Sequence, residues 1–149
     1  CSAGEVSYIV TSRDSMAGPD TIWGTRCGTP YLCRLYAERI GADPREVDGV
    51  QVFEAVARRD PDALDCLERF TKEIAVQIFN LQTVLDVERF AIGGGISAQP
   101  AFLQAIRDQL QALYRRCPYT VPQAEVVACA FQNDANLIGA LQCFFRAYP

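Results

Sequence analysis

Histidine is absent from the 149 residues of this sequence. Without it, the chain alone cannot form a Ser-His-Asp or Cys-His catalytic site, supply a histidine general base, or build a zinc site that contains histidine. Lysine is nearly absent too, because Lys72 is the only one and it lies inside a predicted helix. A P-loop, whose lysine directly follows its glycines, therefore has no counterpart here.

Basic runs and long apolar runs are also missing. The net charge is -4, and no cluster of lysine or arginine stands out, so we expect no nucleic-acid partner. No apolar run approaches the roughly 20 residues that span a bilayer. No signal peptide is recognisable, so we expect a cytoplasmic protein without a membrane partner. Hydrophobic residues make up 50% of the chain, which suits the core of a single domain over residues 1–149.

The cysteines number seven, an odd count with irregular spacing. Cys66, Cys129 and Cys143 lie in apolar patterns, so we expect them to be reduced residues of the core. This usage fits a reducing compartment better than a secreted scaffold held by disulfides.

Hydrophobic periodicity predicts an α/β fold in which helices and strands alternate. The predicted strands cover residues 5–11, 88–92 and 125–131, and the predicted helices cover residues 29–40, 48–58, 60–86, 97–116 and 133–145. Residues 12–28 are expected to form a loop. In the second half, the order helix, strand, helix, strand, helix implies parallel strands with right-handed crossovers, and the first strand is expected to join their sheet.

The last predicted helix carries a well-defined apolar stripe. Asn133 or Asp134 is expected to cap it. The residues that we expect to be buried on this helix are Leu137, Ile138, Leu141, Phe144 and Phe145.

Three consecutive glycines follow the predicted strand at residues 88–92. Glycine permits a positive φ and lets a ligand approach the backbone closely. The helix that begins a few residues later presents unpaired N–H groups, which suit a phosphate or another polar ligand. The glycines alone leave a second interpretation open, a tight strand-to-helix turn with nothing bound.

Three stretches together resemble one protein family. The run Leu81–Ser97 resembles the carboxy-terminal lobe of the ROK family, which holds bacterial sugar kinases and sugar-responsive repressors. Residues 133–140 resemble the closing Asp-Ala-x-x-x-Gly-Ala helix of that family, and Ala3-Gly4-Glu5 resembles the start of its Gly-Glu-x-Gly-His sugar-site motif. These matches occur in the family's order across nearly the whole chain.

The resemblance implies a ribonuclease-H-like fold, the carboxy-terminal lobe of an actin-like ATPase, with a mixed sheet flanked by helices. Sugar and ATP would bind in a cleft between two lobes, with Mg²⁺ on the phosphates. Glu5 would accept hydrogen bonds from sugar hydroxyls, and Tyr8 would contact the sugar. The residues implied in nucleotide binding are Gly93, Gly94, Gly95, Ile96 and Ser97.

The departures from the family pattern concern its zinc motif. Tyr8 stands where the family has a histidine that also ligates zinc in many members. Cys27 and Cys33 only partly match the cysteine motif, and Cys33 is displaced by one residue. A structural zinc site normally takes four nitrogen or sulfur ligands. We therefore expect no zinc and regard the two cysteines as unrelated loop and helix residues.

The catalytic base and phosphate-binding loop of ROK kinases belong to an amino-terminal lobe, which this sequence does not match. We expect the chain to be a fragment of a longer two-lobe protein, to need that missing lobe as its partner, and to hold no catalytic residue of its own. Asp134 is a tempting carboxylate, but its place at a helix start favours a capping role.

Three functions remain open at this stage. The first is the carboxy-terminal lobe of an ATP-dependent hexose or N-acetylhexosamine kinase. The second is the effector-binding lobe of a sugar-responsive transcriptional repressor, and the third is an interaction domain without a small ligand. The first is favoured. Because ROK proteins commonly pair through this lobe, we also expect a homo-oligomer.

Overall fold

The computed structural model describes residues 4–11, 18 and 20–148. The chain divides into two compact units, the first ending at Ile74 and the second beginning at Ala75. Helix α4 (Pro61–Leu85) runs through this boundary. None of the described helices is both long and apolar enough to cross a bilayer.

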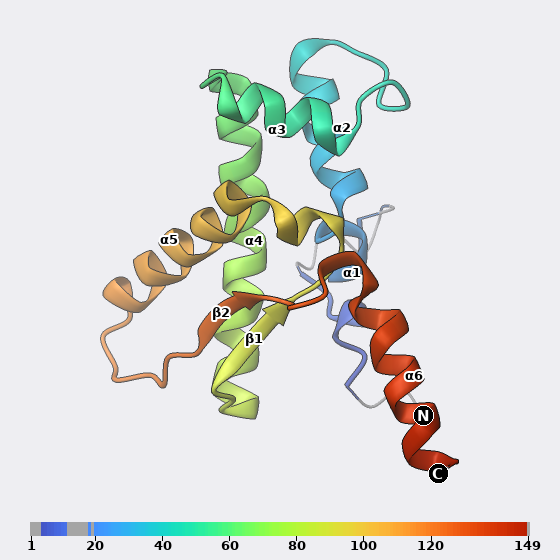
Figure 1. Ribbon diagram of the computed structural model, residues 1–149. Helices are drawn as coiled ribbons and strands as arrows, with labels where there is room; N and C mark the ends of the chain where they lie inside the picture. Colours follow the sequence, from blue (N-terminus) through green and yellow to red (C-terminus); the bar gives the residue numbers. More distant parts are fainter. Residues whose placement is uncertain (1–3, 12–17, 19, 149) are drawn as a thin grey trace. The chain divides into compact units, whose positions relative to one another are not determined.

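The elements follow the predicted order in most of the chain (Figure 1). The first unit contains η1 (Val6–Tyr8), α1 (Trp23–Arg26), α2 (Thr29–Ile40), α3 (Gly49–Ala57) and the first part of α4. The second unit contains the rest of α4, then β1 (Arg89–Ile92), η3 (Gly95–Ala98), α5 (Pro100–Arg116), β2 (Glu125–Ala128), η4 (Gln132–Asp134) and α6 (Ala135–Ala147). The five predicted helices and the two later strands are confirmed, and the class is α/β.

The predicted first strand is wrong for the described residues. Residues 6–8 form the 3₁₀ turn η1, and only an isolated antiparallel bridge between Val10 and Ile22 follows it. The Glu5 carboxylate accepts a hydrogen bond from the Ser7 N–H at 3.2 Å, and such a local bond competes with strand pairing. The predicted loop also contains the short helix α1, whereas its residues 12–17 and 19, like Ala3 of the sugar-site motif, lie outside the described residues.

Helices α2 and α3 begin and end within one residue of the positions that the sequence indicates, although the N-cap of α2 is Gly28 and not Thr29. Pro30 lies in the first turn of α2, and Gly41 ends the helix with a φ of 70°, a conformation that glycine adopts without steric cost. Asp48 caps α3 by accepting from the Gln51 N–H at 2.8 Å, and the Gln51 side chain accepts from the Asp48 N–H at 2.8 Å. This capping box fixes the start of α3.

The core of the first unit lies along one face of α4. Phe70 is fully buried there, as is Cys66, which the sequence places correctly as a reduced core residue. Leu32 of α2 and Val52 of α3 are equally buried. Burying an aliphatic or aromatic side chain contributes roughly 1.5–3 kcal/mol, so these three helices stabilise one another.

The second unit is built on a small parallel sheet. Residues 89–92 of β1 pair in register with residues 125–128 of β2, and α5 provides the crossover between them (Figure 1). The buried face of α5 consists of Phe102, Leu103, Ile106, Leu110 and Tyr114. The parallel pairing predicted from the element order is therefore confirmed.

The burial predicted for α6 is wrong. Its large apolar side chains are all exposed, including Leu137 at 73% and Phe145 at 58%. Cys143 on the same helix is also exposed, and Cys129 is only half-buried, so neither is the core residue that was expected. Asp134 occupies the N-cap position without a side-chain capping bond. Periodicity correctly indicates an amphipathic helix, but nothing within the described residues covers its apolar face.

The exposed face of α6 leads to a prediction about the isolated chain. A contiguous apolar surface of this kind promotes association, so residues 1–149 alone should sediment as a dimer or larger species. Replacing Leu141 and Phe144 together by glutamate should shift the chain to a monomer. Gln142→Glu, which adds charge to the same helix without removing an apolar side chain, should leave the association unchanged. A monomeric wild-type chain at high concentration in sedimentation velocity would contradict this expectation.

Candidate functional site

The predicted nucleotide-binding residues form one corner at the carboxyl end of β1. Gly94 has φ 80° and ψ 170°, a combination that is essentially restricted to glycine. Ser97 is 2% exposed, and its hydroxyl donates to the Gly94 carbonyl oxygen at 2.7 Å while its N–H donates to the same oxygen at 3.1 Å. Ser97 therefore holds the backbone of this corner in place.

The corner exposes bare backbone. Among the residues that the structure describes, a Cβ added to Gly94 or Gly95 would meet no atom within 4 Å, and one added to Gly93 would lie 3.6 Å from the Cys129 sulfur. All three glycines are exposed, and Ile96 beside them is half-buried. A tight turn without any ligand would be enough to explain the positive φ of Gly94. Gly95, however, needs neither a positive φ nor a close contact within the chain, so its lack of a side chain keeps space open.

A pocket of about 500 Å³ lies directly beside the corner. Its lining consists of Ser97, Ala98, Pro100, Ala101, Leu103, Gln104, Arg107 and Gln132. The Gln132 carbonyl accepts from the Gly94 N–H at 3.3 Å, which joins the pocket to the corner. The first turn of α5 borders the pocket, and its Phe102 and Leu103 N–H groups donate to the Gln99 carbonyl oxygen at 3.1 and 3.4 Å.

Arg107 lines this pocket and was not among the candidate residues identified from the sequence. Its Nε and Nη2 donate to the Val126 carbonyl oxygen at 3.0 and 2.8 Å, so the guanidinium ties α5 to β2 while it lines the pocket. The sequence offered one signal for Arg107. It is a charged residue directly after Ile106, in the helix that follows the glycines, where the pattern is otherwise apolar. Gln132, with a φ of 43°, gave no such signal.

The predicted sugar-binding residues lie together in η1 of the first unit. Glu5 is the N-cap of this turn, and its Oε1 accepts from both the N–H and the hydroxyl of Ser7. These bonds lower the pKa of Glu5 below its ordinary value of 4.5, because they favour the charged carboxylate. Tyr8 at the end of the turn is 65% exposed. The turn therefore presents an ionised carboxylate and an accessible phenol.

The two groups of predicted residues belong to different units. Glu5 and Tyr8 are brought together in one turn of the first unit, and residues 93–97 are brought together in one corner of the second. The binding roles assigned to both groups from the family resemblance stay predictions.

The described residues contain no group of three or more His, Cys, Asp or Glu side chains that could hold a metal ion. Cys27 follows α1 and Cys33 lies in α2, and both are free thiols. Burial raises the pKa of each thiol, which disfavours the thiolate form that binds metal. The expectation that the protein binds no zinc stays a prediction.

Comparison with known sequences identifies relatives that act on sugars. A β-glucoside kinase of Klebsiella pneumoniae is 29% identical over 147 residues, which cover 98% of this chain and 47% of that protein. An N-acetylmannosamine kinase of Haemophilus influenzae is 33% identical over 98 residues, which cover 66% of this chain and 29% of that protein. The chain thus spans less than half the length of these curated relatives.

Comparison with solved structures supports the fold over nearly the whole chain. A ROK family protein of Streptococcus pneumoniae, solved with sucrose, matches 97% of this chain and 48% of its own, with a TM-score of 0.83 and 25% identity. A ROK family glucokinase of Streptomyces griseus, solved with glucose and AMPPNP, matches 95% of this chain and 51% of its own, with a TM-score of 0.83 and 21% identity. Both are actin-like ATPases in fold. The ROK family pattern itself matches residues 32–146, and this chain therefore belongs to the ROK family.

Proposed function

We propose that residues 1–149 are the carboxy-terminal lobe of a longer, two-lobe ROK kinase that transfers phosphate from ATP to a hexose or N-acetylhexosamine in the cytoplasm. The observation that carries this proposal is the open backbone at Gly95, where neither the φ angle nor packing against any described residue requires glycine. The named relatives with a stated activity are sugar kinases, which favours a kinase over a sugar-responsive repressor.

The nucleotide would bind at the corner of the second unit. In this proposal the adenosine approaches Gly94 and Gly95, and the pocket that Arg107 lines receives part of it. The positive end of the α5 dipole would favour polar or anionic groups of the ligand. Gly93, Ile96 and Ser97 would shape the corner, and a similarly folded glucokinase of Streptomyces griseus, solved in complex with AMPPNP, supports this proposal.

The sugar would bind at the turn of the first unit. Ionised Glu5 has Oε2 free of any recorded partner among the described residues, because Oε1 takes both bonds from Ser7. A carboxylate oxygen accepts strong, charge-assisted hydrogen bonds from hydroxyl groups. The exposed ring of Tyr8 would pack against a sugar face or donate a hydrogen bond to a hydroxyl.

The chain alone would not catalyse the transfer. Phosphoryl transfer needs a base near the acceptor hydroxyl, together with Mg²⁺ and donors around the phosphates. Asp134 lies at the exposed N-cap of α6, and we propose no catalytic role for it. The base and the Mg²⁺ ligands would come from the amino-terminal lobe, and the complete protein would pair as a homo-oligomer.

A panel assay tests this function. The full-length protein that contains this chain should consume ATP in the presence of one or a few hexoses or N-acetylhexosamines, and the phosphorylated sugar should be detected by mass spectrometry. Residues 1–149 alone should show no consumption above background. Turnover by residues 1–149 alone would refute the proposal that the catalytic residues lie in the amino-terminal lobe. A full-length protein that is inactive on every sugar would refute the proposed kinase function.

The lowered pKa of Glu5 predicts how sugar binding depends on pH. Because its pKa in the folded protein lies below 4.5, the carboxylate stays ionised throughout the neutral and mildly acidic range. Sugar affinity should therefore be constant from about pH 8 to about pH 5 and fall only in more acidic solution. Equilibrium titration of the full-length protein with its sugar measures this, and a fall in affinity near pH 6 would contradict the assigned role of Glu5.

A further inference from the structure

The turn that carries Glu5 and Tyr8 has little packing of its own. Every residue from Gly4 to Thr11 is exposed or half-buried, and η1 is only three residues long. A short turn of this kind does not hold its geometry by itself in water. Its conformation must depend on what lies beside it, and that neighbour is α1.

Helix α1 contacts the turn at two backbone positions. The Trp23 N–H donates to the Ile9 carbonyl oxygen at 2.7 Å. A Cβ on Gly24 would lie 2.8 Å from the Ser7 Cβ and 3.2 Å from the Ser7 carbonyl oxygen, so only glycine fits there. Ser7 in turn supplies both hydrogen bonds to Glu5. The position of α1 therefore sets the position of the Glu5 carboxylate.

Arg26, the last residue of α1, links this assembly to longer elements. Its Nη1 donates to the Thr11 hydroxyl at 3.2 Å, at the far end of the segment that begins with Glu5. Its Nη2 forms an ion pair with Glu73 of α4. Helix α1 has only four residues and cannot be stable alone, so its contacts with α2 and the Arg26 link to the 25-residue helix α4 hold it in place.

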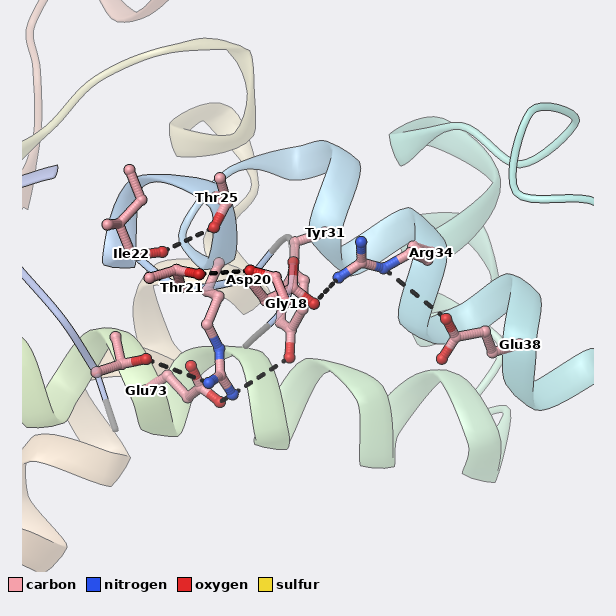
Figure 2. Close-up of polar contacts among 11 residues, drawn as sticks. Gly18, Asp20, Thr21, Ile22, Thr25, Tyr31, Arg34, Glu38 and Glu73 are labelled. Carbon is pink, nitrogen blue, oxygen red and sulfur yellow. Dashed lines mark hydrogen bonds and ion pairs between the residues drawn. The ribbon is translucent and has the colours of Figure 1, made fainter. Parts of the chain in front are cut away.

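The surroundings of Arg26 and Glu73 favour a firmly held pair. The guanidinium lies over the Tyr31 ring, with its central carbon 5.6 Å from the ring centroid. Arg34 approaches the same ring, at 5.1 Å, and is itself paired with Asp20 (Figure 2). Burial raises the pKa of Glu73, and Arg26 opposes that rise. Each partner therefore depends on the other, since a half-buried charge without its counterion is costly.

We propose that Arg26 and Glu73 are positioning residues that hold the Glu5–Tyr8 turn in the orientation that receives the sugar. This inference rests on the function proposed above. The link runs from α4 through the Arg26–Glu73 ion pair to α1, and from Gly24 of α1 to Ser7 and the Glu5 carboxylate. Neither Arg26 nor Glu73 touches the sugar, so their loss should affect the affinity for sugar and spare the chemistry.

The test uses the full-length protein with the variants Arg26→Met, Glu73→Gln and the two combined. Each single variant should raise the KM for sugar about tenfold, as expected for the loss of a charged hydrogen-bonding partner. The KM for ATP and kcat at saturating sugar should stay within about twofold of the wild type. The combined variant should be no worse than the poorer single variant, because two residues that act as one pair are not additive.

A second ion pair provides the matched control. Arg39 of α2 pairs with Asp62 and Asp65 of α4, at 2.8 and 3.3 Å, so Arg39→Met removes an arginine that is ion-paired to the same long helix without touching α1. It should leave all three kinetic parameters unchanged. The positioning role would be refuted if Arg39→Met raised the KM for sugar equally, if the effects of Arg26→Met and Glu73→Gln added in full, or if kcat fell while the KM for sugar did not.

Hydrogen exchange distinguishes failure of this inference from failure of the proposed kinase function. In Glu73→Gln, which preserves side-chain size, the Trp23 amide bonded to Ile9 should exchange about tenfold faster than in the wild type, whereas Asp62→Asn should not change it. This measurement needs no substrate. If the wild type phosphorylated no sugar, the kinase proposal would fail, and unchanged exchange at Trp23 would independently show that the pair does not hold the turn.

Discussion

Replacing Glu5 by glutamine is expected to lower kcat/KM for the sugar about a hundredfold, because a neutral amide accepts hydroxyl hydrogen bonds more weakly than a carboxylate and offers one oxygen instead of two. The Ser7 N–H can still donate to the amide oxygen as it does to Glu5 Oε1, so the turn should keep its shape. The KM for ATP should stay near its wild-type value. Initial-rate kinetics with sugar and ATP varied separately measure this on the full-length protein.

Two further variants show whether the charge of Glu5 acts on the sugar or only on the turn. Ser7→Ala removes the hydroxyl that donates to Glu5 but leaves the backbone N–H and the carboxylate, so it should cost much less than Glu5→Gln. Glu46→Gln removes a comparable exposed carboxylate elsewhere in the first unit and should have no effect. Equal losses in Glu5→Gln and Ser7→Ala would mean that Glu5 acts as a cap and not as a sugar ligand.

Replacing Gly95 by valine should raise the KM for ATP about thirtyfold without destabilising the protein. A Cβ at this position meets no atom of the described residues within 4 Å, and the position needs no positive φ, so the fold should accept the side chain. A bound adenosine would meet it directly, and such a steric conflict costs on the order of 1–3 kcal/mol. ATP kinetics and the melting temperature of the full-length protein, measured together, separate the two effects.

Comparison with other glycines sharpens this result. Gly95→Ala should give a smaller increase in the KM for ATP, in proportion to its smaller side chain. Gly94→Ala should behave differently, because its φ of 80° strains any side chain and should lower the melting temperature as well. Gly139→Ala, at an open glycine of α6, should not change the KM for ATP. An unchanged KM for ATP in Gly95→Val would remove the main support for nucleotide binding at this corner.

The long helices were predictable because their signals are local. The apolar spacing of α4 and the cap residues of α2 and α3 lie within a few positions of one another, and side chains at these spacings share one face. The first strand failed for the opposite reason. Its alternating β-prone residues suggest a strand, but the carboxylate of Glu5 satisfies the Ser7 N–H locally, and periodicity does not register that competition.

Helix α6 shows what periodicity cannot settle. Its spacing correctly indicates one apolar face, and the same pattern predicts that this face is buried within the chain. The exposed Phe144 and Phe145 contradict that step. A hydrophobic stripe shows that a face prefers to be covered, but it does not show which part of a protein covers it.

The candidate site was predictable only where the backbone itself carries the signal. Three adjacent glycines after a strand are visible in any sequence, so the corner was found. Arg107 lies on the crossover helix α5, and Gln132 follows β2. Both come to the corner only because the chain folds back on itself, so neither is indicated by nearby sequence. The Arg26–Glu73 pair joins residues 47 positions apart, and one arginine among many charged residues gives no indication of its partner.

Photolabelling of the full-length protein with 8-azido-ATP tests the central claim, that adenosine lies against the glycine corner, most directly. Trypsin cleaves after Arg89 and Arg107, and no other arginine or lysine lies between them, so the whole corner is released in one peptide, residues 90–107. The account predicts that this peptide carries the label and that excess unlabelled ATP prevents the labelling. Label that ATP displaces from other peptides, with none on residues 90–107, would contradict it.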